Sequence, residues 1–302
     1  MNKVSVILTS YNGEKTIKKT IYSILNQNGI NDEFSIELIS IDDCSSDKTK
    51  EILKEFDIIK LNTLKNSGGP NAGRNIGLKK ATGKFICIAD QDDIWDPNKL
   101  IKLLPYLQKA PIVTSGYKLY DTSQNKELIR GNKHENGFIF YKKNETFIKR
   151  LTKSIDGQST YLGSIIFNES LKDILFEEEY GMVDFDWMVK LFHQQKSIEV
   201  CEPLYTRNVD GTNLSLNDSY REKDFNFSLN FIQEYSFTYP NEVKIAHKKI
   251  HGSRARYYYL IGNMKKARYY FLKSSLNLKT IAYYLTTFVG SKYVKKKFNV
   301  FG

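Results

Sequence analysis

Residues 1–115 alternate short apolar segments with amphipathic helical segments, and this alternation limits the possible folds more than any other feature of the chain. The stretches between the apolar segments repeat apolar residues at the spacing of a helix. Strands that are connected through helices run parallel, and the helices then cover both faces of the sheet. The pattern therefore predicts an α/β fold with a mainly parallel, Rossmann-like sheet. The apolar segments lie at residues 4–9, 36–41, 58–61, 85–89 and 111–115.

The character of the chain changes toward its C-terminal part. Beyond the strand and helix pattern, residues 216–302 are predicted to be helical and rich in Tyr, so we expect one α/β domain over residues 1–215 followed by a helical extension. From Asn241 onward, fourteen Lys and Arg residues accompany a single acid, Glu242. The net charge of this segment is about +13, and that of the preceding part is about −2, which together give the +11 of the whole chain.

Basic, Tyr-rich helices suit the anionic surface of a membrane, where each basic residue contributes about 1 kcal/mol. A helical cap whose Lys and Arg side chains are only solvated is the alternative. No stretch approaches the ~20 apolar residues that a membrane-spanning helix needs, and no signal segment precedes the first strand. These features predict a cytoplasmic protein that associates peripherally with the inner face of the cell membrane.

Polar side chains follow the ends of several predicted strands. Thr9 and Tyr11 come at the end of the first strand, and Asp42 and Asp43 follow the second. In open α/β sheets, ligands bind at the carboxyl edge of the strands. A carboxylate that accepts the N–H of a pyrimidine base would explain the adjacent acids, and Tyr11 could stack on the same base. A half-buried aromatic residue in a loop is the alternative for Tyr11.

A later strand is followed by the acidic run Asp90-Gln91-Asp92-Asp93. Like charges this close repel one another, and crowding them at the end of a buried strand costs stability unless a positive group joins them. Mg²⁺ and Mn²⁺ are commonly held by one or two carboxylates together with substrate phosphates. The run therefore predicts a divalent-cation site. A solvated acidic turn before the next helix, capped by Asp96, is the alternative.

Two further segments carry candidate functional residues. Residues 66–77 are rich in Gly and enter a helix, which favours close approach of a phosphate, and Arg74 lies within them. Arg74 can pair with a diphosphate or with a nearby Asp. In the predicted helix that follows Val183, Asp184 shares a face with the apolar residues and suits a general base. Asp186 points to the other side, and we expect it to be a solvated charge or one near the helix N-terminus.

These motifs, in this order, resemble those of the family 2 glycosyltransferases with a GT-A fold that build bacterial surface polysaccharides. The resemblance is dense over residues 1–100 and becomes thinner up to about residue 215. It rests on Val4-Ser-Val-Ile-Leu-Thr-Ser-Tyr-Asn12, Asp42-Asp-Cys-Ser-Ser-Asp47, the segment from Asn66 to Phe85, and Asp90-Gln-Asp-Asp-Ile-Trp-Asp-Pro97.

The resemblance implies a set of roles for the residues at the strand ends. Thr9, Tyr11 and Asp43, with Asp42 beside them, would bind the nucleoside of a UDP- or dTDP-linked sugar. Arg74 and Asp90 would lie near the donor phosphates. Asp92, with Asp90 or Asp93, would hold Mn²⁺ or Mg²⁺. Many relatives complete the metal shell with a His, and Asp210 takes its place here.

The resemblance also implies an inverting reaction with Asp184 as the catalytic base. One sugar would pass from the nucleotide-sugar donor to a saccharide acceptor, most naturally one linked to a polyprenyl lipid, because the basic extension suits a membrane surface. A nucleotidyltransferase is one alternative, but the first strand is not followed by the Gly-rich, basic loop it needs. A non-enzymatic protein that binds nucleic acid or membranes through its basic extension is another, and no nucleic-acid-binding motif accompanies that charge.

Overall fold

The computed structural model describes residues 1–122, 125–154, 156–180, 184–209 and 218–289. The chain divides into two compact units. The first consists of residues 1–147 and 156–220, and the second of residues 148–155 and 221–302. Residues 148–155 therefore belong to a unit whose other part follows them by more than sixty positions, which no local sequence signal indicated.

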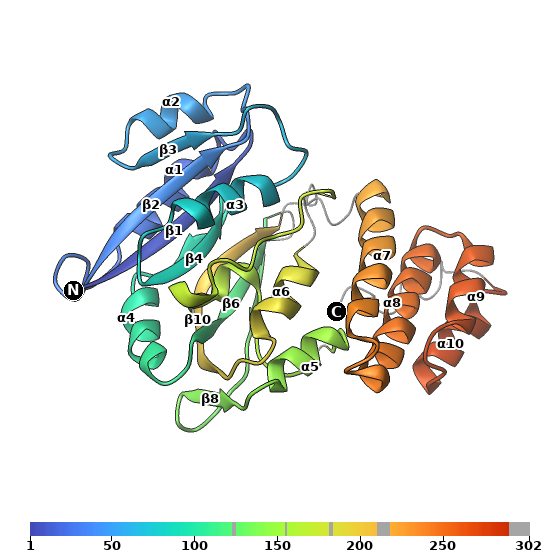
Figure 1. Cartoon of the computed structure of the whole chain (residues 1–302). Helices are drawn as coiled ribbons and strands as arrows, with labels where there is room; N and C mark the ends of the chain where they lie inside the picture. The colour runs from blue at the N-terminus through green and yellow to red at the C-terminus, as the bar shows by residue number, and fades with distance from the viewer. Residues whose placement is uncertain (123–124, 155, 181–183, 210–217, 290–302) are drawn as a thin grey trace. The chain divides into compact units, whose positions relative to one another are not determined.

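The first unit is built around one mixed sheet (Figure 1). Its strands are β1 (Asn2–Ser10), β2 (Phe34–Asp42), β3 (Ile59–Asn62), β4 (Phe85–Asp90), β5 (Ile94–Trp95), β6 (Ile112–Asp121), β7 (Lys126–Arg130), β8 (Phe138–Tyr141), β9 (Ile166–Asn168) and β10 (Ser197–Val209). Its helices are α1 (Ile17–Leu25), α2 (Thr49–Lys54), α3 (Asn71–Lys80), α4 (Lys99–Leu103) and α6 (Phe185–Phe192), and α5 (Glu145–Leu151) begins in this unit.

The strand order is β3-β2-β1-β4-β9-β6-β10-β5, with β7 paired to β6 and β8 to β10. The four strands β3, β2, β1 and β4 run parallel, as the alternation of strands and helices predicted. In the rest of the sheet, β6 and β10 run parallel, whereas β9 pairs antiparallel with β4 and β6, β7 pairs antiparallel with β6, and β5 and β8 pair antiparallel with β10. The α/β class is confirmed, and the sheet as a whole is mixed.

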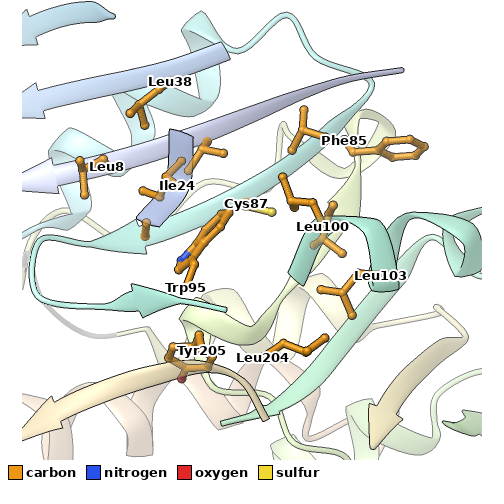
Figure 2. Packing of buried hydrophobic residues seen from close by; sticks show 14 of the residues in the cluster. Leu8, Ile24, Leu38, Phe85, Cys87, Trp95, Leu100, Leu103, Leu204 and Tyr205 are labelled. Atoms are coloured by element: carbon orange, nitrogen blue, oxygen red, sulfur yellow. The ribbon is translucent and has the colours of Figure 1, made fainter. Parts of the chain in front are cut away.

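The two faces of the sheet are covered by different helices, because successive residues of a strand point to opposite sides. On one side, Val4, Val6 and Leu8 of β1 belong to a buried cluster with residues of α1 and α4. Figure 2 shows members of this cluster, among them Leu8 of β1, Cys87 of β4 and Leu204 of β10. The opposite face carries α3, which packs against β1 and β2. The cluster residues from the helices are Ile17, Ile21, Ile24, Leu100 and Leu103.

Helix α3 approaches the sheet closely because it presents glycine to it. A Cβ atom at Gly77 would lie 2.3 Å from Cγ2 of Ile7, and one at Gly73 would lie 3.0 Å from Cγ2 of Thr9. The two glycines are one helical turn apart, so they form a flat strip along the helix. The same turn of α3 carries Arg74, and the close packing fixes how far this side chain reaches.

We expect Gly77→Ala to lower the free energy of unfolding by about 1–3 kcal/mol, because the added methyl group overpacks the contact with Ile7. Alanine is the better helix former, so a loss of stability cannot come from helix propensity. Urea denaturation measures the change. Lys79→Ala, on the exposed face of α3, is the matched control. A Gly77→Ala protein as stable as the wild type would show that α3 does not depend on this close approach.

The described part of the second unit is helical. It comprises α7 (Asp218–Ile232, whose first residues belong to the first unit), α8 (Pro240–Leu260), α9 (Met264–Leu272) and α10 (Leu278–Thr286), and α8 packs against α9. A small buried cluster joins the last three helices. Within the described residues, no helix combines the length and the apolar character needed to cross a membrane. The cluster consists of Ala255, Tyr258, Tyr259, Ala267 and Phe271, with Tyr283 packed against it.

Candidate functional site

The loops that follow β1, β2 and β4 are tied together at the carboxyl edge of the sheet. In the register of the sheet, Thr9 lies beside Ile41 on one side and Asp90 on the other, so the three strands end at the same level. The amide side chain of Gln91 accepts a hydrogen bond from the backbone N–H of Tyr11 at 2.8 Å and donates one to its carbonyl at 3.1 Å. The backbone N–H of Asn12 donates to Ser45 Oγ at 2.9 Å. The predicted convergence of these strand ends is therefore present.

Of the two adjacent acids after β2, Asp42 serves the loop itself. Its buried carboxylate accepts a hydrogen bond from the backbone N–H of Ser45 at 2.9 Å and one from Ser10 Oγ at 3.4 Å. Lys50 Nζ lies 3.7 Å from Asp42 Oδ2. This turn passes through Cys44, whose φ of 61° is in the left-handed region. Asp42 thus shapes the turn that carries the next residue.

Asp43 is held by residues from beyond β3. Its carboxylate accepts hydrogen bonds from Thr63 Oγ1 at 2.7 Å, from the backbone N–H of Ser67 at 3.0 Å and from Ser67 Oγ at 2.9 Å. These bonds join the β2 loop to the start of the Gly-rich segment. The ring of Tyr11 is 49% exposed, so one face of an aromatic ring is accessible at this edge. Thr9 is buried below it.

Arg74 is almost fully buried and pairs with the acidic run. Its Nη2 lies 2.7 Å from Asp90 Oδ1, its Nη1 donates to Asn71 Oδ1 at 3.1 Å, and its guanidinium carbon lies 5.2 Å from the centroid of the Phe176 ring. The ion pair that the sequence left open as one alternative is therefore present. Arg74 Nε has no hydrogen-bond partner in the described part of the chain. A buried donor without a partner is costly, so this nitrogen is a candidate donor to a ligand.

The three carboxylates of the acidic run differ in their surroundings. The Asp90 side chain is 34% exposed, and Asp92 is half-buried, with its carbonyl accepting a hydrogen bond from Asn208 Nδ2 at 2.7 Å. Asp93 is only 2% exposed, and its Oδ2 has no hydrogen-bond partner among the described residues. Burial raises the pKa of Asp93 well above its ordinary value, and the charges of Asp90 and Asp92 raise it further. Negative charge in this run is therefore not compensated by the protein alone.

A buried lysine lies beneath the acidic run. Lys99 Nζ donates to the carbonyl of Gly163 at 2.5 Å and lies 3.5 Å from the centroid of the Trp95 ring. Burial lowers the pKa of Lys99 to about 8. The space around Asp93 is closed, because a Cβ atom at Gly163 would lie 2.6 Å from Asp93 Oδ2. Asp93 thus belongs to the packed layer under the loop, and its role as a metal ligand stays a prediction.

Asp184 stands directly before α6 and is half-buried. Its carbonyl accepts a hydrogen bond from the backbone N–H of Met188 at 3.0 Å, which starts the helix. Asp186 lies in the first turn of α6, which agrees with the expectation of a charge near the helix N-terminus, but it is not solvated. Asp186 is fully buried and pairs with Lys190 Nζ at 3.0 Å, because the first turn of α6 is packed on both of its sides.

Tyr161 lies within electrostatic reach of these carboxylates. Burial raises the pKa of its hydroxyl group, the charges of Asp90, Asp93 and Asp184 raise it further, and that of Arg207 opposes them. The Arg207 guanidinium lies 4.6 Å from the centroid of the Tyr161 ring. Asp184 and the acidic run therefore act electrostatically on the same hydroxyl group. Sequence reasoning missed Tyr161 and Arg207, since neither stands in a motif.

A second connection runs through stacked side chains. The ring of Phe176, which faces Arg74, stacks on Trp187 of α6 with centroids 4.4 Å apart and planes 7° from parallel. The Asn75 side chain pairs with the backbone of Phe176. It donates a hydrogen bond to the Phe176 carbonyl at 2.9 Å and accepts one from the Phe176 backbone N–H at 2.8 Å. Trp187 Nε1 donates to the Ile174 carbonyl at 2.8 Å. A continuous set of side-chain contacts thus joins the acidic run to the start of α6.

We expect Asn75→Leu to lower the free energy of unfolding by about 2–4 kcal/mol, because it leaves the buried N–H and carbonyl of Phe176 without partners. Equilibrium unfolding in urea measures the change. Lys80→Leu, on the exposed end of α3, controls for the added apolar side chain. Equal stability of the Asn75→Leu protein and the control would mean that these two bonds do not hold the segment.

The described residues contain no group of three His, Cys, Asp or Glu side chains placed to hold a metal ion. Asp210, the further ligand predicted from the sequence, lies outside the described residues. A metal at the acidic run would thus take part of its coordination shell from a bound ligand.

The model of the family described as glycosyl transferase family 2 matches residues 5–174, more than half of the chain. The chain belongs to this family.

Curated relatives of this family 2 chain are named as glycosyltransferases. The chain is 39% identical over 128 residues, 42% of its length and 49% of the relative's, to the UDP-Glc:alpha-D-GlcNAc-diphosphoundecaprenol beta-1,3-glucosyltransferase WfgD of Escherichia coli. It is 34% identical over 122 residues, 38% of its length and 47% of the relative's, to the putative teichuronic acid biosynthesis glycosyltransferase TuaG of Bacillus subtilis. The match spans about half the length of these relatives.

Solved structures confirm the GT-A fold of this family 2 chain. A crystal structure of residues 1–349 of Staphylococcus aureus TarS in complex with UDP covers 98% of this chain and 93% of its own, with a TM-score of 0.64 and 19% identity. The complex of the same TarS fragment with UDP-GlcNAc gives a TM-score of 0.59 at 20% identity, with the same coverage of both chains. Both the resemblance and the fold class predicted from the sequence are therefore confirmed.

Proposed function

We propose that the protein is an inverting glycosyltransferase that moves one sugar from a nucleotide-sugar donor to a saccharide acceptor in the synthesis of a bacterial surface polysaccharide. One observation carries the proposal. In a chain of family 2, the acidic run after β4 and the start of α6, which Asp184 precedes, are joined by the contacts Asp90–Arg74, Arg74–Phe176 and Phe176–Trp187. This arrangement provides a place for the donor diphosphate and a carboxylate that can accept a proton.

The donor nucleoside would bind at the loops after β1 and β2. The accessible ring of Tyr11 is suited to stacking on a pyrimidine base, and Asp43 stands on a loop that Asp42 and Ser67 hold in place. Asp90 would hold the guanidinium group of Arg74 in place, and Arg74 would orient the diphosphate through its unpaired Nε. Binding of UDP and UDP-GlcNAc by TarS supports a uridine donor, with a thymidine donor as the alternative.

The residues of the acidic run fit a divalent cation, Mn²⁺ or Mg²⁺. Asp90 and Asp92 offer carboxylate oxygens that are not fully buried. Burial raises the pKa of the neighbouring Asp93, and the charges of Asp90 and Asp92 raise it further. Two carboxylates together with substrate phosphates are a common arrangement for these ions. When bound, the cation would neutralise charge on the leaving diphosphate. Asp210 as a further ligand stays a prediction.

Asp184 would act as the general base. It takes the proton of an acceptor hydroxyl group while the hydroxyl oxygen attacks the anomeric carbon from the face opposite the diphosphate. A new carbon–oxygen bond forms, the bond from the anomeric carbon to the diphosphate oxygen breaks, and the configuration inverts. No covalent sugar–enzyme intermediate is needed. The half-buried position of Asp184 at the start of α6 holds the carboxylate in place for this step.

The acceptor is proposed to be linked to a lipid at the inner face of the cell membrane. The acceptor named for WfgD is a diphosphoundecaprenol-linked sugar, and the C-terminal segment of this chain is strongly basic. Apolar side chains on α10 and just after it are exposed, so they are available to a membrane interface. They belong to Leu278, Ile281, Leu285, Phe288 and Val289.

Asp184→Asn should lower kcat for sugar transfer by about 10²–10⁴-fold, because the amide cannot accept the acceptor proton. The KM for the donor should stay near the wild-type value. Transfer is measured over a panel of UDP-, dTDP- and GDP-linked sugars with Mn²⁺. Asp173→Asn, an exposed acid of the same unit, is the control. Wild-type turnover by Asp184→Asn would remove Asp184 from the proposed chemistry, and no turnover or binding of any donor by the wild type would end the proposed function.

Asp92→Asn should raise the Mn²⁺ concentration for half-maximal activity by about tenfold or more, as loss of a metal-site group does. Asp93→Asn should leave this concentration nearly unchanged, because Asp93 is buried below the loop. The two variants remove the same charge from adjacent positions, so each serves as the control for the other. An equal effect of both would instead support Asp93 as a direct ligand.

A further inference from the structure

Arg254 of α8 is a buried cation in the second unit, far along the chain from the proposed transferase site. It is 6% exposed, and only Nη2 has a hydrogen-bond partner, the Tyr258 hydroxyl oxygen at 2.8 Å. Nε and Nη1 have no partner in the described part of the chain, where Arg254 also forms no ion pair. Burying a charged group with unmade hydrogen bonds costs stability, so these two donors call for an explanation.

The guanidinium group of Arg254 is fixed by aromatic rings. Its central carbon lies 4.7 Å from the centroid of the Tyr258 ring, 5.3 Å from that of Phe225 and 5.6 Å from that of Tyr257. Cation–π contacts of this kind stabilise the charge over the faces of the rings. They do not satisfy N–H groups, which need acceptors in the plane of the guanidinium. The rings therefore hold the group in position and leave two of its nitrogens for an acceptor.

Arg254 lines a cavity that lies wholly within the second unit. The cavity has an empty volume of about 340 Å³, its open mouth included. Arg221 and Lys153 also line it, together with a single acid, Asp224. Asp224 Oδ1 accepts a hydrogen bond from Ser228 Oγ at 3.2 Å, and Asp224 forms no ion pair with Arg254. Three cations against one anion give the cavity a positive charge.

We propose that this cavity binds a phosphate group. Three cationic side chains around one pocket suit an anion with several acceptor oxygens on different sides, and the unpaired donors of a fixed arginine are well matched to phosphate. Two sources share this chemistry, a phosphodiester in the acceptor chain and the headgroup of an anionic lipid. The inference adds a second anion site to the proposed function and does not depend on the identity of the sugar donor.

Titration calorimetry of the full chain with inorganic phosphate tests the proposal. Saturating UDP and a chelator are present throughout, so that the proposed donor site does not contribute to the signal. We expect Arg254→Gln to weaken phosphate binding at least tenfold, and Arg221→Gln, which changes a partly exposed residue, to weaken it in the same direction. Lys248→Gln removes an equal charge from an exposed position of α8 outside the cavity and should bind like the wild type.

Phosphate binding that is absent, or equal in all four proteins, would overturn the proposal. Because Arg221→Gln alters a less buried side chain, its result stands even if Arg254→Gln fails to fold. Sedimentation with phosphatidylglycerol vesicles then separates the two sources. Loss of vesicle binding in both cavity variants but not in Lys248→Gln assigns the phosphate to a lipid headgroup, and equal vesicle binding by all assigns it to another phosphodiester. Donor turnover, measured separately, reports on the proposed function alone.

Discussion

The ion pair between Arg74 and Asp90 connects the parts of the first unit from which the candidate site is built. Arg74 comes from α3, on one face of the sheet, and Asp90 is the last residue of the strand β4. The pair is nearly buried on the arginine side and open on the aspartate side. An arrangement of this kind gives a strong, directed interaction without removing the carboxylate from solvent. The guanidinium group can thus restrain Asp90 while one side of it still faces a ligand.

The restraint on Asp90 depends on residues that have no role in the proposed reaction. The glycines of α3 set the distance between the helix and the sheet, and therefore the reach of Arg74. Phe176 lies between the guanidinium group and Trp187, so the start of α6 is positioned against the same arginine. Asp184 precedes that helix directly. The proposed base and the acidic run, which are almost a hundred residues apart in sequence, are in this way held by one continuous set of contacts.

The sequence predicted the parts of the fold whose signals are local. The strands β1, β2 and β4 are continuous apolar segments, and the polar residues after them meet as expected. β10 was not predicted, because Glu199, Glu202 and Arg207 interrupt its apolar pattern. Glu199 is nevertheless fully buried, since the Tyr141 hydroxyl and the Asn132 amide donate to its carboxylate at 2.9 and 2.8 Å.

The same limit applies to the candidate site. The burial of Asp186 could not be predicted, because its partner and its packing are set by the folded chain, and Tyr161 stands in no motif. The motifs identified the strand ends and the acidic run, but which carboxylate of the run is exposed depends on neighbours such as Gly163, which is more than sixty residues away. Sequence patterns therefore locate the loops of the site. They do not show which of several adjacent acids is exposed and which is buried.

The path of the chain between the two units has a consequence for how the protein can be divided. The chain passes from one unit to the other after residues 147, 155 and 220. Within the second unit, Lys153 Nζ donates to Ser228 Oγ and Lys249 Nζ to Ser154 Oγ, both at 2.9 Å. A chain cut after residue 220 would keep residues 148–155 but lose the rest of the compact unit to which they belong. The second unit is therefore completed by a segment that lies between two parts of the first unit in the sequence, and no single cut separates the two units cleanly.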